Sequence, residues 1–327
     1  MILDDPTVEG YDIIGDVHGC DDALIRLLRL LDYECHQDVW HHPRRKVVFV
    51  GDIIDRGPGI RQAMRLVRRM VDAGQAHMVL GNHEFNAVAY STLCHQTVSP
   101  RLQRYYRRLG FHLKSSLMDY RFHLQEWKEL IHWLRKLPIF LEFKHFRVVH
   151  ACWDPRRIAQ AASCHHGQVL LDDDFLAQSM LPATEPNRIV ERLLKGTEME
   201  LPDGLSLVGS DGVRRTRFRT KFWSQSPKTY GDVVFQPDAL PDELYHQPLT
   251  PDERNRLLLY GVDQKALLVG HYWCQGQPQI IRHNLACLDY SAVKNGLLVA
   301  YRMGAESQLS NDRFVWVNNA GLSCPSQ

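Results

Sequence analysis

The 327-residue sequence lacks an excess of charge of one sign, since 39 lysine and arginine residues face 38 acidic residues. Proteins held on nucleic acid or on anionic membranes by long-range attraction carry a basic surplus. We therefore expect no stable nucleic-acid binding and no membrane binding. Any affinity for phosphate must come from a local site.

Long apolar runs are also missing. No window holds the roughly 18 uninterrupted apolar residues that a membrane-spanning helix requires. The first strand-like run begins at Tyr11, without a preceding basic and apolar leader. These absences predict a cytoplasmic protein without a membrane segment.

Cysteine provides no framework either. The eight cysteines are scattered, without a CxxC pair or regular spacing. This pattern argues against both a disulfide scaffold and a thiolate zinc site, so free thiols are expected. Internal repeats and low-complexity tracts are absent too, and a hydrophobic fraction of 44% is ordinary for a packed globular protein.

What is present is an alternation of short β-branched runs and amphipathic helical patterns. Residues 21–34 and 60–74 place apolar side chains on one helical face, and residues 123–138 do the same up to Pro138. Such alternation favours an α/β fold in which helices cover sheets. The expected strands are 11–16, 46–52, 77–81, 139–143, 146–151 and 267–270.

The stretch from about residue 155 to 265 differs from the rest, because it is richer in Pro, Asp and Gly and poor in long apolar runs. We expect one domain over residues 1–327, with 155–265 as a cap-like insertion within it. Inside this stretch, 205–223 predicts a hairpin around Ser-Asp-Gly. Beyond it, antiparallel strands that complete the core are expected at 279–284, 285–290 and 296–302.

Three sequences share one plan, in which an apolar strand is followed by a glycine and then by polar side chains. They are DIIGDVHG (12–19), VVFVGDIIDRG (47–57) and MVLGNHE (78–84). Because the carboxyl ends of strands meet at one edge of an open α/β sheet, these polar residues are expected in one crevice. They are Asp16, His18, Asp52, Asp55, Arg56, Asn82, His83 and Glu84.

Two further histidines each follow an apolar strand far down the chain. Mixed oxygen and nitrogen donors suit Mn, Fe or Zn better than Ca or Mg. Six ligands exceed the needs of one ion, but they fit two ions about 3.5–4 Å apart if Asp52 bridges them. Two cations can activate a shared water and neutralise phosphoryl oxygens. The predicted ligands are Asp16, His18, Asp52, Asn82, His150 and His271.

Three neighbouring residues complete the predicted catalytic set. His83 is expected to protonate the leaving oxygen, with Asp55 orienting its ring. Arg56 offers a planar fork for two phosphate oxygens. Any one histidine alone would more often be a surface or core residue, since the chain has 17 of them. The ordered combination of GDVHG, GDIIDRG and GNHE favours the metal site.

At these residues the sequence resembles the calcineurin-like metallophosphoesterase superfamily and, within it, the phosphoprotein phosphatase branch, whose pattern runs GDxHG, GDxxDRG, GNHE, HAG and GH. The last two stand here as His150-Ala151-Cys152 and Gly270-His271. The resemblance implies a four-layer α/β/β/α sandwich. It also implies one metal held by Asp16, His18, Asp52 and His271, and a second held by Asp52, Asn82 and His150.

A later segment points to one part of this branch. Residues 286–302, ACLDYSAVKNGLLVAYR, resemble the LDTGxxxGGxLTALR segment of bacterial members such as the symmetrical diadenosine tetraphosphatases and PrpE-like phosphatases. Tyr290 and Ser291 replace Thr-Gly, and Cys152 replaces the glycine of HAG. These departures keep the metal ligands and leave two substrates open, a phosphorylated protein or a nucleotide polyphosphate.

Substrate contacts are harder to assign. As a strand, residues 214–223 would place Arg215, Arg217, Arg219 and Lys221 on one face. Either that face is solvated, or one arginine turns into the crevice as a second phosphate clamp, as the resemblance implies. Tyr272 and Trp273 either stack on a substrate ring or pack in the core. The candidate substrate-binding residues are Arg56, Asn82, Arg215, Arg217, Arg219 and Tyr272.

The sequence therefore predicts a hydrolase of phosphate esters or anhydrides with two divalent ions, most favourably Mn²⁺, with Fe, Zn and Mg as alternatives. A phosphodiesterase or nuclease is the second possibility, but the near-zero net charge and Arg56, which suits a terminal phosphoryl group, weigh against it. A non-catalytic metal-binding scaffold would be expected to have lost a ligand or His83. Neither is lost here.

Overall fold

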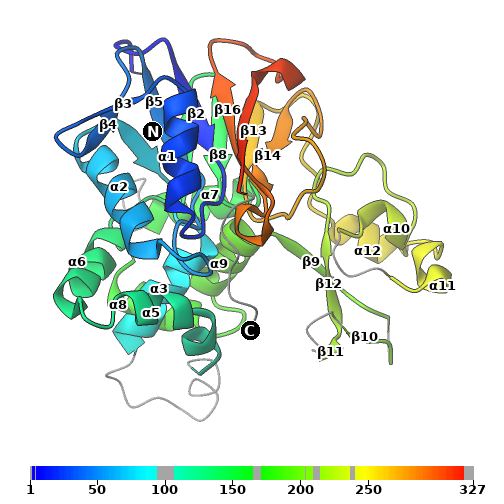
Figure 1. The fold of residues 1–327 in the computed structure, drawn as a ribbon. Helices are drawn as coiled ribbons and strands as arrows, with labels where there is room; N and C mark the ends of the chain where they lie inside the picture. Colours follow the sequence, from blue (N-terminus) through cyan, green and yellow to red (C-terminus); the bar gives the residue numbers. More distant parts are fainter. Residues whose placement is uncertain are drawn as a thin grey trace.

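Two β-sheets pack face to face in the computed structural model, and helices lie on their outer sides (Figure 1). The structure describes residues 2–3, 5–93, 107–164, 171–202, 204–208, 214–235 and 240–319. Within these ranges, every helix is too short or too polar to cross a membrane.

The first sheet has the strand order β15-β16-β2-β5-β6, and β17 pairs with β16. Strands β2, β5 and β6 run parallel, so their carboxyl ends lie at one edge of the sheet. Strand β16 is antiparallel to β2. The bounds are β2 Gly10–Ile14, β5 Arg45–Phe49, β6 Ala76–Met78, β15 Asp289–Tyr290, β16 Leu297–Met303 and β17 Phe314–Asn318.

The second sheet has the order β1-β7-β8-β13-β14. Strands β8, β13 and β14 run parallel, β7 is antiparallel to β8, and β1 is parallel to β7. This sheet therefore offers a second set of aligned strand ends. The bounds are β1 Ile2–Leu3, β7 Phe140–Phe143, β8 Phe146–Val149, β13 Ala266–Val269 and β14 Leu285–Cys287.

Side-chain alternation along the strands fills the space between the sheets. Ile13 and Val48, adjacent in register, belong to the same buried cluster as Val148 and Leu268 of the second sheet. All four are fully buried. Removing apolar surface from water in this way is the main stabilising contribution to such a layer.

The opposite faces of the sheets carry the helical layers. Helices α1 (Asp21–Leu30) and α2 (Ile60–Asp72) bury the apolar stripes that the sequence predicted, in one cluster with Ile14 and Phe49. The same cluster includes Leu267 of the second sheet and Leu193 of helix α9 (Glu185–Lys195). The expected four-layer α/β/β/α sandwich is confirmed.

Further helices surround these layers. Helix α6 ends at Leu134, earlier than the predicted end at Pro138, and Pro138 itself disfavours helical geometry only at Leu137. The bounds of these further helices are α3 Asn82–Leu93, α5 Lys114–Asp119, α6 Leu124–Leu134, α7 Pro155–Cys164 and α8 Asp173–Ser179. A separate two-stranded sheet pairs β3 Glu34–His36 with β4 Val39–His41. Five cysteines whose side chains the structure describes are free thiols: Cys20, Cys35, Cys152, Cys274 and Cys287.

The predicted insertion has two parts. The first part comprises helices α7, α8 and α9, whose apolar side chains join the large core cluster. Residues 197–257, which we call the side segment, have a small buried cluster of their own and project beside the sheets (Figure 1). The single domain over 1–327 with a cap at 155–265 stays a prediction. The elements of the side segment are β9 Thr197–Glu200, β10 Leu207–Val208, β11 Arg214–Arg215, β12 Arg217–Thr220, α10 Tyr230–Val233, α11 Asp242–Tyr245 and α12 Pro251–Arg256.

Three strand predictions need correction. The hairpin over 205–223 is limited to β10 and β11, since β12 pairs with β9 instead, and its turn at 209–213 lies outside the described residues. Residues 279–284 form no strand, because the Ile280 amide donates to the Asn311 side chain and only a local bridge joins Arg282 to Leu285. Strand β14 runs parallel to β13, whereas β15 and β16 are antiparallel as expected.

Candidate metal centre

The strand ends of both sheets meet where the sequence predicted a site. Asp16 and His18 follow β2, Asp52 follows β5, and Asn82 begins α3 just after β6. From the second sheet, His150 follows β8 and His271 follows β13. All except Asn82, which is half-buried, are buried. The structure therefore brings the six predicted ligands together.

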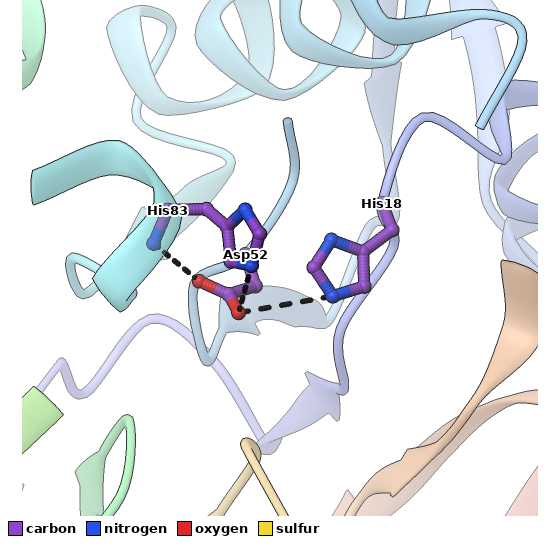
Figure 2. A group of neighbouring side chains, drawn as sticks. All are labelled: His18, Asp52 and His83. Carbon is purple, nitrogen blue, oxygen red and sulfur yellow. Dashed lines mark hydrogen bonds and ion pairs between the residues drawn. The ribbon is translucent and has the colours of Figure 1, made fainter. Parts of the chain in front are cut away.

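Asp52 lies at the centre of this group. Its Oδ2 is 3.4 Å from Nε2 of His150, 3.7 Å from Nε2 of His18 and 3.9 Å from Nε2 of His83. Figure 2 shows the rings of His18 and His83 both directed toward the Asp52 carboxylate. Two sets of candidate ligand atoms share Asp52, each within 4.8 Å, namely His18, Asp52 and His83, and Asp16, Asp52 and His150.

Hydrogen bonds fix which ring nitrogen faces the centre. Nδ1 of His18 lies 3.0 Å from the carbonyl of Ile54, and Nδ1 of His150 lies 2.8 Å from that of Val50. Carbonyl oxygens only accept, so both Nδ1 atoms carry a proton and donate it. In the neutral rings, each Nε2 then directs a lone pair toward Asp52. Histidine ligands of metals are oriented in this way by backbone acceptors.

The side chain of His271 belongs with Asn82 and His150. Its Nδ1 donates to Oδ1 of Asn82 at 2.8 Å, and that same oxygen lies 3.1 Å from Nε2 of His150. The resemblance grouped His271 with Asp16 and His18, but it is the His271 backbone amide that donates to Asp16, at 3.2 Å. The side-chain hydrogen bond of His271 is therefore with Asn82, and its contact with Asp16 is through the backbone amide.

Two buried ring nitrogens have no partner. Nε2 of His18 and Nε2 of His271 accept and donate no hydrogen bond among the described residues. A buried polar atom without a partner costs about 1–3 kcal/mol. Lone pairs that converge with the carboxylates of Asp16 and Asp52 are the environment that a divalent cation neutralises. The donor set therefore fits metal ions.

The electrostatics of the site agree with this interpretation. Burial and then the charges of Asp289 and Asp52 raise the pKa of Asp16 well above its usual value. Although burial opposes it, the imidazoles of His150 and His83 hold the pKa of Asp52 well below its usual range. Acidic groups this close together disfavour one another's charge, and a shared cation removes that repulsion.

Several site residues adopt left-handed backbone geometry that side chains other than glycine rarely take. The φ angles are 45° at His18, 52° at Asp52, 68° at Asp55, 71° at Arg56 and 65° at His271. Such residues cluster at functional sites because surrounding structure must hold them in place, at a cost of about 1–3 kcal/mol each. The strain is concentrated in the predicted motifs.

The glycines before two ligands have a steric reason. A Cβ on Gly270 would lie 2.1 Å from Oδ1 of Asp16, and one on Gly81 would lie 2.1 Å from Oδ1 of Asp52. In each case a carboxylate from another loop occupies the space that a side chain would fill. Glycine is thus required for the loops to approach.

Glu84 reaches the site but not as a ligand. Its carboxylate accepts from the backbone amides of Asp52 and Ile53, both at 2.8 Å, and from those of Ile54 and Gly81, both at 3.1 Å. Four amide donors occupy both oxygens of this fully buried group. Glu84 therefore fixes the loop that presents Asp52.

His83 and its neighbours form the predicted acid group. Nδ1 of His83 donates to Asp55 at 2.6 Å, and Nη2 of Arg56 lies 3.3 Å from Nε2 of His83. Although burial opposes it, Asp52 and then Asp55 raise the pKa of His83. The hydroxyl of Ser116, in α5, donates to the other oxygen of Asp55. Sequence reasoning missed Ser116, since a lone serine 61 positions away gives no signal.

Asp289 is a second residue that sequence reasoning missed. It is buried in β15, accepts from the amide of Ser291 at 2.9 Å, and its Oδ2 has no hydrogen-bond partner among the described residues. Its charge contributes to the raised pKa of Asp16. The LDY sequence after an apolar run, at the same sheet edge, was the available signal.

The predicted substrate-binding residues have different surroundings in the structure. Tyr272 as a substrate contact is wrong, because its ring is fully buried among Phe222, Trp223 and Phe235, so the core alternative holds. Arg217 is exposed and pairs with Glu198 at 3.6 Å.

The remaining two cap arginines differ in reach. Burial and then the charge of Arg219 lower the pKa of His271, so Arg219 lies within electrostatic reach of the site. Arg215 lies half-buried in β11.

The sequence pattern of the calcineurin-like phosphoesterase family matches residues 11–272, which include all six candidate ligands. The chain belongs to this family. It is similar to the asymmetrical bis(5'-nucleosyl)-tetraphosphatase PrpE of Halalkalibacterium halodurans, with 49% identity over 22% of this chain and 30% of that protein. It is also similar to the symmetrical bis(5'-nucleosyl)-tetraphosphatase of Buchnera aphidicola, with 32% identity over 46% of this chain and 47% of that protein.

These matches span less than half the length of either relative. Among solved structures, a putative diadenosine tetraphosphatase aligns over 97% of both chains with a TM-score of 0.46 and 17% identity.

Proposed function

We propose that the chain is a phosphohydrolase that depends on two divalent ions and cleaves phosphomonoesters, such as phosphoserine and phosphothreonine, or nucleotide polyphosphates. One observation carries the proposal. The Nε2 atoms of His18 and His271, buried and unpartnered among the described residues, lie among oxygen and nitrogen donors that include Asp52 and Asn82.

Within this proposal we assign the donors to two ions that share Asp52. Asp16 and His18 with Asp52 would hold one ion, and Asn82, His150 and His271 with Asp52 would hold the other. Mn²⁺ is the first candidate, and Fe, Zn and Mg are alternatives, since carboxylate, carboxamide and imidazole donors accept all of them. When bound, such a pair supplies water activation and neutralisation of phosphoryl oxygens.

The protein's own residues supply the remaining chemistry. His83, held by Asp55 at 2.6 Å, is positioned to deliver a proton to the leaving oxygen. Asp55 keeps the ring in one tautomer by accepting from Nδ1, which leaves Nε2 for the substrate. The guanidinium of Arg56, 3.3 Å from that nitrogen, is suited to bind phosphoryl oxygens. We assign Arg219 as the cap arginine that assists, because it is half-buried in β12 and its charge lowers the pKa of His271, whereas Arg217 is exposed and paired with Glu198.

Metal-reconstituted hydrolysis tests the proposal. Chelated protein would receive Mn²⁺ and then either a phosphoserine peptide or diadenosine tetraphosphate, on the same preparation. Mn²⁺-dependent turnover of either substrate is the expected result, and preference for one identifies the substrate class. Turnover of neither, with Mn²⁺ bound, would contradict the proposal and leave a metal-binding scaffold.

A further inference from the structure

Beside the metal centre, two cations lie on one indole ring. Cζ of Arg56 is 4.9 Å and Nζ of Lys294 is 3.7 Å from the ring centroid of Trp273, two residues after His271. Neither cation forms an ion pair with a carboxylate among the described residues. Since the ring attracts both charges, it fixes their positions without neutralising them.

The backbone presents Lys294 at a defined place. It ends a short 3₁₀ helix, Ala292–Lys294, between Ser291 and Asn295, whose φ angles are 54° and 59°. A Cβ on Gly296 would meet the carbonyl of Tyr290 at 2.1 Å, so the loop has no room to relax there. The amide of Ser291 is bound by Asp289. The backbone of this loop is therefore held in one conformation, which fixes the position of Lys294.

The two cations disfavour one another. Burial and then the charge of Arg56 lower the pKa of Lys294, and Asp289 partly opposes this. An anion placed between like charges removes their repulsion. A chain of two or more phosphoryl groups offers an oxygen to each.

Resting on the proposed function, we propose that Lys294 is a specificity-determining residue that binds the phosphoryl group next to the one being cleaved. With Arg56 and Trp273 it forms what we call the indole clamp. The clamp selects phosphoanhydride chains over phosphomonoesters at the same metal centre. It uses a point charge on a flexible stem, as phosphate-binding lysines do.

The first test compares two substrates in three variants. In Lys294→Gln, the ratio of kcat/KM for diadenosine tetraphosphate to kcat/KM for p-nitrophenyl phosphate should fall about tenfold, the scale of a lost charge-assisted hydrogen bond. Lys294→Arg should keep most of the ratio, because the charge remains. Lys144→Gln, an exposed lysine in the turn between β7 and β8, is the matched control and should change neither rate.

A second readout is independent of turnover. In Mn²⁺-loaded protein, methylenediphosphonate should slow acetylation of Lys294 by acetic anhydride about tenfold, as measured by mass spectrometry, because a bound amine is a poor nucleophile. Inorganic phosphate should protect it much less. Lys144, in the same sample, should be acetylated equally with and without either anion.

The outcomes separate the two proposals. If the parent protein hydrolyses neither substrate, the proposed function fails. If it hydrolyses them but Lys294→Gln keeps the substrate ratio, or methylenediphosphonate protects Lys294 no better than phosphate does, the indole clamp is wrong and the proposed function stands.

Discussion

The strand-end loops and the side segment differ in how strictly their structure is determined. In the loops, left-handed residues such as His18 and Asp52 are held by buried hydrogen bonds and by glycines with no space to spare. In the side segment, strands of two and four residues cover one small buried cluster. A cavity of about 570 Å³ there is lined by residues that include Arg217, Tyr230 and Glu253.

This difference suggests separate roles, with the strand-end loops responsible for catalysis and the side segment for substrate recognition. A metal site requires donors held within fractions of an ångström, so its loops tolerate little change. A surface segment with few buried contacts can vary without disturbing those donors. We therefore expect substitutions in the loops to abolish turnover and substitutions in the side segment to alter substrate affinity.

The largest effect is expected at the shared carboxylate. Asp52→Asn removes the charge around which His18, His83 and His150 lie, so the protein should lose bound metal and turnover should fall about 10⁴-fold or more. Metal content measured after dialysis, together with kcat, checks this. A fully loaded and active variant would remove Asp52 from its bridging role.

A somewhat smaller effect is expected at the acid. His83→Asn removes the proton donor but not the proposed donors of either ion, so metal content should stay constant while kcat falls about 10² to 10⁴-fold. Ser116→Ala should act in the same direction but more weakly, because it only frees one oxygen of Asp55. Unchanged turnover in His83→Asn would exclude it from the reaction.

Two arginines of β12 test whether the side segment affects substrate affinity. Arg219→Gln should raise KM about tenfold, since its charge reaches the site, with kcat changed less. Arg217→Gln, two residues away in β12 and paired with Glu198, is the matched control and should change KM less than about twofold. Equal effects of the two variants would contradict the assignment of Arg219.

The smallest effect concerns stability, away from both regions. Glu126 in α6 binds Arg61 at 2.7 Å and Arg65 at 2.5 Å in α2. Although burial opposes it, Arg65 and Arg61 lower the pKa of Glu126. A lowered folded-state pKa means that the stabilisation is complete above the usual glutamate pKa and is lost as the pH falls through the folded-state value.

Glu126→Gln should therefore lower the free energy of unfolding by about 1 kcal/mol at pH 7, and the difference from the parent should shrink below about pH 4. Urea denaturation at both pH values measures it. Glu129→Gln, exposed on the same helix, is the control. A difference that grows at low pH would show that the ion pairs are not its cause.

Much of the metal centre could be predicted because each ligand follows its strand directly. The apolar runs before Asp16, Asp52 and His150 fix both the strand and the edge at which the ligand lies, so local sequence carries the long-range geometry. The alternation in β12 was also readable, since Phe218 and Thr220 are buried while Arg217 is exposed. Thr216 broke the pattern, because it lies in a bend between β11 and β12.

The features that could not be predicted depend on contacts with residues far away in the sequence. Ser116 meets Asp55 across 61 residues, and the parallel pairing of β14 with β13 depends on packing context that local β-propensity does not specify. Tyr272 is buried by three aromatic rings of the side segment, namely Phe222, Trp223 and Phe235. The role proposed for Lys294 depends on its position beside Arg56 and Trp273, which the sequence around Lys294 does not indicate.

The central feature of the proposed site is a pair of ions that share Asp52. Crystals of the protein soaked in Mn²⁺ and measured at the manganese absorption edge would locate them by anomalous scattering. We predict two peaks about 3.5–4 Å apart, one beside Asp16 and His18 and one beside His150 and His271, with Asp52 between them. A single peak, or two peaks that do not share Asp52, would contradict it.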